Sequence, residues 1–597
     1  MIFSNAPDKM LSKASFTSRR RMLCTGAAGI LVLGYVLLLY WFGSRDFYQL
    51  HFFDRGLPVR HYDRARLLFI FYFAWLVYAA GAMSMRIVAG AESCAKVPTH
   101  ERFPLGFLVG VAVWSILLFP FGLVGLYEKP FALAITIAAM LVSSPHLTDC
   151  IDAGISALAR AWMSRVVSFG SIRHNATSRL QRAAKLLVRW LVWIAIATAV
   201  TLFLLVKGLY PGGGHDFYNH YFPYYLRVIQ TGSILPNDVW YHFYLSKGDG
   251  LYFLAILLTD PLAPQLVTAG FILCGSFIVF ALLRRISPVG LLPCIGVLLY
   301  FAFFIYTPGP HEFMVAGGWG DLEKEHELTA VLLLGVIWCI VRLCESPREN
   351  KRLWILGLHA SIVATILITL QLGFLIGLYL AGFGLWFAVK RQWQLASIPF
   401  FGCVTAAITM AAILVINYAL TGLVLDQSVL FTWPVVNLAK VTQWGAVFET
   451  IDLDKRMLEL SASAASWSRT IFWLLPCYLR LELWWPLMGV ASIFGVYRIA
   501  RSGHMKNSIP TPITPVIWSL FWFCGTVVFA ALVGGGRSQT VTFYRLTSFS
   551  YAPTLCMGLA IWHFGLGDFS CKRLRLIKTI LAGSLSVMLL VGIAVEG

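Results

Sequence analysis

Two short stretches of this sequence gather side chains that could catalyse a reaction. In the first, Asp216 follows three glycines and lies between His215 and His220, in a segment rich in aromatic residues. A carboxylate that is partly removed from water can act as a general base toward a hydroxyl group. The glycines allow the backbone to turn sharply and a ligand to approach it closely. Residues 209–250 are therefore the first candidate site.

The second stretch is an acidic cluster at residues 321–327. Glu323, His326 and Glu327 are spaced i, i+3 and i+4, so a helix that begins near Asp321 would carry them on one face. Asp321 and His326 could bind a divalent cation, Mg²⁺ or Mn²⁺, and hold a phosphate leaving group through it. Glu323 and Glu327 are the candidates for a catalytic role in this cluster.

Other polar residues near these stretches, and in a late loop, could bind a substrate. The candidates are His215, Tyr218, His220, His242, Lys247, Arg537 and Arg545. Arg545 follows Phe543 and Tyr544 at the start of a predicted helix. It is the favoured phosphate ligand, because a guanidinium binds phosphate with two parallel hydrogen bonds.

Each of these features also has an interpretation without catalysis. Asp216 could cap the helix that follows it, and the Glu323–Glu327 cluster could be a solvated first turn, where acidic residues are favoured. The aromatic residues suit a membrane interface. His220 and His242 could be structural, and Arg545 could be an anchor that reaches toward the interface. The sequence leaves these alternatives open.

The elements that must position these residues are membrane-spanning helices. The chain has 597 residues, of which 58% are hydrophobic and 13% are charged, whereas about a quarter of the residues in soluble domains are charged. Apolar runs of about 18 or more residues, long enough to cross a bilayer, recur along the whole length. We therefore predict an all-α polytopic membrane protein with about 15 transmembrane helices.

The distribution of Lys and Arg predicts the orientation of these helices. The predicted spans are residues 22–43, 66–85, 104–126, 130–146, 186–207, 263–283, 288–306, 328–345, 353–371, 373–389, 397–421, 484–499, 514–533, 546–564 and 576–595. Basic residues collect on alternate loops, as expected of the cytoplasmic side. The N-terminus is then cytoplasmic, its first apolar run is a retained helix, and both candidate stretches lie outside a plasma membrane.

Charge and cysteine content exclude other classes of protein. The net charge of +19 would suggest nucleic-acid binding in a soluble protein. Here no basic domain lies outside the apolar runs, so we expect no nucleic-acid partner. The 12 cysteines are scattered, mostly within apolar runs and without a C-x-x-C pair. We interpret them as small core residues, not as a disulfide framework or a metal site.

The arrangement of the two loops resembles the GT-C superfamily of membrane glycosyltransferases. In both, a helix leaves the cytoplasm and delivers a long outer loop with an early Asp among aromatic and histidine residues, and a second acidic outer loop follows one helix pair later. The resemblance covers residues 186–430. It implies a GT-C-like core, a polyprenyl-phosphate sugar donor, and a glycan, lipid or protein acceptor. It also implies that Asp216 is the catalytic base, with a second acidic site in 321–327.

The resemblance divides the chain into three parts. Residues 1–185 would form accessory transmembrane helices and a basic cytoplasmic segment, 186–430 the core, and 431–597 a C-terminal outer segment with further helices. The family usually places the catalytic loop after its first helix, whereas four additional helices precede it here.

Two other functions remain as alternatives. A polysaccharide polymerase or ligase of the O-antigen type would be expected to use outer arginines and a late-loop histidine. The late loop offers Arg537 and Arg545 but no histidine. A transporter or flippase of lipid-linked substrates should carry ionisable residues in the middle of its helices. The apolar runs contain almost none.

Overall fold

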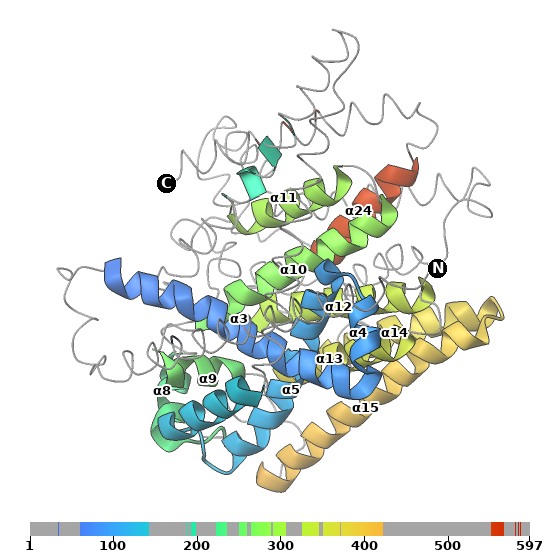
Figure 1. Cartoon of the computed structure of the whole chain (residues 1–597). Helices are drawn as coiled ribbons and strands as arrows, with labels where there is room; N and C mark the ends of the chain where they lie inside the picture. Colours follow the sequence, from blue (N-terminus) through green and yellow to red (C-terminus); the bar gives the residue numbers. More distant parts are fainter. Residues whose placement is uncertain are drawn as a thin grey trace, which may run out of the picture.

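The computed structural model shows a helical protein, as the sequence predicts (Figure 1). It describes residues 60–142, 222–235, 250–259, 264–287, 291–305, 325–345, 350–370, 372–421 and 551–565, with single positions at 34, between 188 and 198, and between 580 and 586. Every regular element bounded within these ranges is an α-helix. The helices are α3 (Arg60–Ala89), α4 (Ala91–Lys96), α5 (Thr99–Leu123), α8 (Phe222–Thr231), α9 (Gly250–Leu258), α10 (Pro264–Ile286), α11 (Leu292–Ile305), α12 (Glu325–Glu345), α13 (Lys351–Ile368), α14 (Leu372–Val389), α15 (Trp393–Thr421) and α24 (Tyr551–Gly565).

Six of the described helices are long and apolar enough to cross a membrane. These segments are Tyr72–Ala89, His100–Leu123, Val267–Ile286, Leu328–Glu345, Lys351–Ile368 and Trp393–Leu420. Shorter apolar helices coincide with four more predicted spans: Lys129–Val142, Leu292–Phe301, Leu375–Val389 and Ala552–Ile561. The remaining predicted spans lie wholly or largely outside the described residues. The total of about 15 transmembrane helices therefore stays a prediction.

Helix α5 begins earlier than the apolar pattern predicts. The sequence predicts a span from residue 104, whereas the helix begins at Thr99. Its first turns contain His100, Glu101 and Arg102, which the search for apolar residues leaves out. Backbone hydrogen bonding continues through these polar residues, and the side chain of Glu101 is fully buried. Polarity therefore marks the edge of the apolar run, not the end of the helix.

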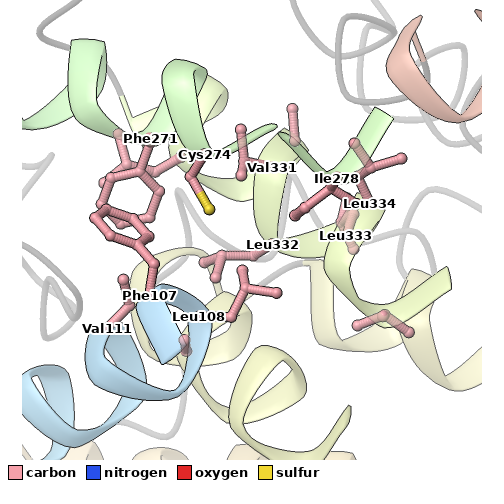
Figure 2. Close-up of a cluster of buried hydrophobic side chains, with 14 of the residues drawn as sticks. Phe107, Leu108, Val111, Phe271, Cys274, Ile278, Val331, Leu332, Leu333 and Leu334 are labelled. Carbon is pink, nitrogen blue, oxygen red and sulfur yellow. The ribbon is translucent and has the colours of Figure 1, made fainter. Parts of the chain in front are cut away.

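Helices α5, α10 and α12 share an apolar core. Figure 2 shows Phe107, Leu108 and Val111 of α5 facing α10 and α12, where Phe271, Cys274, Ile278 and Val331 to Leu334 lie. The rings of Phe107 and Phe271 meet edge to face at 5.2 Å. A Cβ atom on Gly335 of α12 would lie 2.7 Å from a methyl group of Leu108. Side chains from three helices therefore interlock, and van der Waals packing of this kind holds helices together in lipid.

Glycines bring the backbones of α3 and α5 into direct contact. A Cβ atom on Gly81 of α3 would lie 1.7 Å from the carbonyl oxygen of Gly106, and one on Gly110 would lie 1.8 Å from that of Val77. Gly106 and Gly110 form a G-x-x-x-G pair, the spacing that allows close helix approach in membranes. Any larger side chain at these positions would push the two helices apart.

Helix α15 lies along one edge of the described helices and exposes apolar side chains (Figure 1). Phe400, Ile408 and Val415 are 62%, 64% and 66% exposed. Exposed apolar surface of this extent is unusual on a soluble protein and marks contact with a membrane or a partner. On a helix that is long and apolar enough to span a bilayer, it favours contact with lipid.

Candidate functional site

Most of the predicted site residues lie outside the described residues. These are His215, Asp216, Tyr218, His220, His242, Lys247, Asp321, Glu323, Arg537 and Arg545. His326 and Glu327 are in the first turn of α12, which the structure begins at Glu325. The face predicted to hold Glu323, His326 and Glu327 cannot be followed in full, because Glu323 lies outside the described residues. The catalytic, substrate-binding and metal assignments therefore stay predictions, as does the three-part division of the chain.

The helices that flank the first candidate stretch pack through aromatic rings. Helix α8 follows the Asp216 segment directly, and α9 begins where residues 209–250 end. The rings of Tyr224 and Tyr225 on α8 lie 5.7 and 5.6 Å from that of Phe253 on α9, both edge to face. Edge-to-face rings stabilise such contacts beyond the area they bury. The aromatic residues predicted as an interfacial belt thus include at least two, Tyr224 and Tyr225, that are buried between helices.

A pair of turns fixes α8 and α9 to the C-terminal end of α5. The N–H of Tyr127 donates to the carbonyl of Gly232 at 2.9 Å, and the N–H of Ile234 donates to that of Gly122 at 3.0 Å. Gly232 has a φ of 68°, a left-handed conformation that glycine adopts without strain. The backbone after α8 is therefore hydrogen-bonded to the turn after α5.

Tyr127 extends this junction to the start of α9. Its hydroxyl donates to the carbonyl of Leu118 at 2.9 Å, and its ring lies 5.3 Å from that of Phe253. A Cβ atom on Gly250 would lie 2.9 Å from Leu118 and 3.0 Å from the Tyr127 hydroxyl. The first residue of α9 thus rests on the last turns of α5, which leaves the loop between α8 and α9 with both ends held at one place.

Four charged side chains form a closed ring where α5 begins and where α10 and α12 end; we call Glu101, Arg285, Arg342 and Glu345 the charge ring. One carboxylate oxygen of Glu101 accepts from Arg285 Nε at 3.0 Å and Nη2 at 2.7 Å. Its other oxygen lies 3.1 Å from Arg342 Nη2. Glu345 Oε2 accepts from Arg342 Nη1 at 2.7 Å and lies 3.8 Å from Arg285 Nη1. Two positive and two negative charges therefore balance.

Tryptophans of α12 and α13 enclose the buried side of the charge ring. The guanidinium of Arg342 lies 4.8 Å from the ring centroid of Trp354, a cation–π contact. Trp354 in turn meets Trp338 edge to face at 5.0 Å. The side chain of Glu101 has no exposed surface and that of Arg342 is 10% exposed, whereas that of Arg285 is 35% exposed. The charge ring is therefore mostly buried, and among its four side chains Arg285 is the most exposed, followed by Glu345 at 18%.

The described residues that adjoin the two candidate stretches lie far along α5 and α12 from the charge ring. Glu325 precedes Arg342 by 17 residues on α12, and Leu118 follows Glu101 by 17 residues on α5; each interval spans about 25 Å of helix. The start of α12 and the Leu118–Gly250 junction are therefore equally far from the charge ring when measured along their own helices.

Sequence reasoning missed the charge ring. It interpreted Arg285 as one of the basic residues that fix orientation, left Arg342 unused, and attached no role to Glu101 or Glu345. A signal was present, because acidic residues are scarce in this chain and these two lie at helix ends otherwise rich in Lys and Arg. A buried acid among cations needs a partner, so each predicts an ion pair.

Among side chains that the structure describes, no group of three or more His, Cys, Asp and Glu residues could hold a metal ion. The predicted ligands Asp321 and His326 are not among these side chains. Comparisons with family models, with curated proteins and with solved structures found no match to this chain.

Proposed function

We propose that this protein is an inverting membrane glycosyltransferase that moves a sugar from a polyprenyl-phosphate donor to a glycan, lipid or protein acceptor. The reaction would take place on the outer face of the plasma membrane. The observation that carries the proposal is the gathering of acids, histidines and aromatic residues in two loops, 209–250 and 321–327, in a chain with few other polar segments.

In the proposed reaction, Asp216 removes the proton from the acceptor hydroxyl as its oxygen attacks the anomeric carbon. The bond from that carbon to the phosphate oxygen breaks, and the polyprenyl phosphate leaves with the bonding electrons. The phosphate needs a cation beside it, and Arg545, Arg537 and Lys247 are the predicted outer cations proposed for this role. The face formed by Glu323, His326 and Glu327 positions a metal ion or the phosphate.

The remaining polar side chains of the loops would bind the substrates and a cation. Asp321 and His326 offer one carboxylate and one imidazole, a donor set that suits Mn²⁺ better than Mg²⁺, which prefers oxygen ligands. A bound cation would neutralise charge on the leaving phosphate. The hydrogen-bonding side chains that face the sugar would be His215, Tyr218, His220 and His242.

The packing of the described helices supports this proposal in one respect. Gly250, at the end of the first loop, lies against Leu118, about 25 Å along α5 from Glu101, and Glu325 lies the same distance from Arg342 along α12. A polyprenyl-phosphate donor would approach from lipid at this level of the membrane. Rigid helix ends beside both loops are what a site for an extended lipid substrate requires.

The proposal is tested with membranes that contain the protein and a panel of radiolabelled polyprenyl-phosphate hexoses and pentoses. Removing a general base typically lowers the rate by about 10²–10⁴-fold, so Asp216→Asn is expected to abolish most transfer. Asp426→Asn, in another predicted outer segment, is the matched control and should keep full activity. Transfer that survives in Asp216→Asn would exclude the mechanism. Movement of the labelled lipid across proteoliposomes without any transfer product would favour a flippase instead.

A further inference from the structure

The charge ring takes no part in the proposed reaction, yet three helices contribute to it. We propose that the charge ring sets the register of α5, α10 and α12, and so fixes the height at which their opposite ends meet the outer loops. Glu101, Arg285 and Arg342 are then positioning residues. The statement about register stands alone, whereas its consequence for catalysis rests on the proposed function.

The apolar contacts between these helices distinguish one register from the next less sharply than paired charges do. No charged side chain lies between Phe103 and Leu123 on α5, between Pro264 and Leu283 on α10, or between Leu328 and Val341 on α12. Lipid tails are as apolar as leucine, so no hydrophobic driving force adds to the van der Waals packing of these contacts. A shift of one turn would bring other apolar residues into contact.

The charge ring does distinguish one register from the next. A one-turn shift moves a helix by about 5.4 Å, whereas the contacts of Glu101 with Arg285 and Arg342 are 2.7 and 3.1 Å long. Each oxygen of Glu101 faces a different helix, so sliding either α10 or α12 leaves one oxygen without its cation. A buried charge without a partner is strongly unfavourable.

A role in setting the register explains why buried charges are present here, which a role in stability alone does not. Replacing a buried ion pair by well-packed apolar residues is often neutral or stabilising, because the charges lose their hydration on burial. Single polar residues in coiled-coil cores, by contrast, specify register at a cost in stability. The charge ring has the same features: it is polar, enclosed by Trp354, and confined to one level of an apolar bundle.

A change of register at the charge ring would also move the far ends of the helices, to which the two loops are joined. Leu118, which holds Gly250, and the first turn of α12 are each about 25 Å from the charge ring along continuous helix. A slip of one helix at the charge ring moves the far end of that helix by the same amount. In the proposed transferase, this would displace His326 and Glu327 relative to the Asp216 segment.

Disulfide cross-linking tests the register. A Cβ atom on Gly335 would lie 2.7 Å from Leu108, so Leu108→Cys with Gly335→Cys reports the native register. Leu105→Cys or Ala112→Cys, each with Gly335→Cys, reports a shift of about one turn in either direction. Copper-catalysed oxidation in membranes, followed by mass spectrometry of the linked peptides, separates these products from those of the native cysteines.

The ring is removed by Glu101→Met, Arg285→Met, Arg342→Met and Glu345→Met together, which leaves no unpaired charge. We expect the otherwise native chain to form only the 108–335 link, and this variant to form a shifted link at comparable yield. Glu101→Gln, which removes the charge that faces both α10 and α12, provides a second variant if the fourfold variant does not fold. A folded variant that forms the 108–335 link alone, at native yield, overturns the proposal.

Sugar transfer measured on the same variants separates the two proposals. A shifted link together with a fall in kcat, but little change in KM, supports both the register and its effect on the reaction. A shifted link in a protein whose unaltered form transfers no sugar would refute the proposed function and leave the register intact.

Discussion

Neutralising Glu101 should destabilise the protein far more than neutralising an exposed acid. Removing one partner of a buried ion pair typically costs about 3–5 kcal/mol. After Glu101→Gln, Arg342 keeps Glu345 at 2.7 Å, and Arg285 is 35% exposed and can reach water. Both features limit the loss, so we expect about 3 kcal/mol, the low end of that range. This corresponds to roughly a hundredfold change in the ratio of folded to unfolded protein.

The matched control is Glu92→Gln. Glu92 pairs with Lys96 at 3.8 Å, and its side chain is 90% exposed; such surface pairs contribute about 0–1 kcal/mol. Both variants remove one negative charge from neighbouring parts of the chain. Reversible unfolding by SDS titration in mixed micelles, followed by tryptophan fluorescence, measures the two changes. Equal midpoints for Glu101→Gln and Glu92→Gln would show that the charge ring does not stabilise this protein.

Three further expectations follow from the packing. Gly110→Ala should lower the free energy of unfolding by about 1–3 kcal/mol, because the added carbon meets backbone that cannot move aside, whereas a Cβ atom on Gly377 meets nothing within 4 Å; equal SDS midpoints for Gly110→Ala and Gly377→Ala would contradict this. Tyr127→Phe should cost about 1 kcal/mol through loss of its hydrogen bond to the Leu118 carbonyl, and an unchanged midpoint would show that this bond is dispensable. Burial raises the pKa of the Cys94 thiol more than the nearby arginines lower it, so at about pH 8.5, the ordinary thiol pKa, the folded protein holds less thiolate than the unfolded chain. Maleimide should therefore label Cys94 more slowly in micelles than in SDS, with a rate that still climbs above this pH; equal rates would mean that the thiol is accessible.

The existence and approximate position of the described helices could be predicted because each depends on the sum of many apolar side chains. Residues 328–345 illustrate this: the apolar run predicts a span, and the structure forms α12 from Glu325–Glu345. The start of α5 could not be predicted from the same sum. Its first turns are polar and are buried only because Arg285 and Arg342 come from distant parts of the chain to meet Glu101.

The candidate site could be predicted only as far as its chemistry is local. The spacing of His326 and Glu327 follows from the sequence, and their place in the first turn of α12 agrees with a helix that starts in this region. Whether Asp216 approaches them depends on the relative height and rotation of several helices. Apolar patterns contain little information on either, because neighbouring registers bury similar side chains.

Tyr127 and Glu101 show how a few polar side chains can specify the relative heights of helices in an apolar bundle. Tyr127 joins the end of α5 to α9 through a hydrogen bond and a ring contact, and Glu101 joins the start of α5 to α10 and α12 through both of its oxygens. The two residues lie near opposite ends of the same helix, so α5 relates the height of the first loop to that of α12. In a bilayer, where apolar contacts discriminate little between alignments, a few polar contacts of this kind specify where distant loops come to lie. A sequence search for such sites should therefore begin with the scarce acids at basic helix ends, before it turns to the loops that they position.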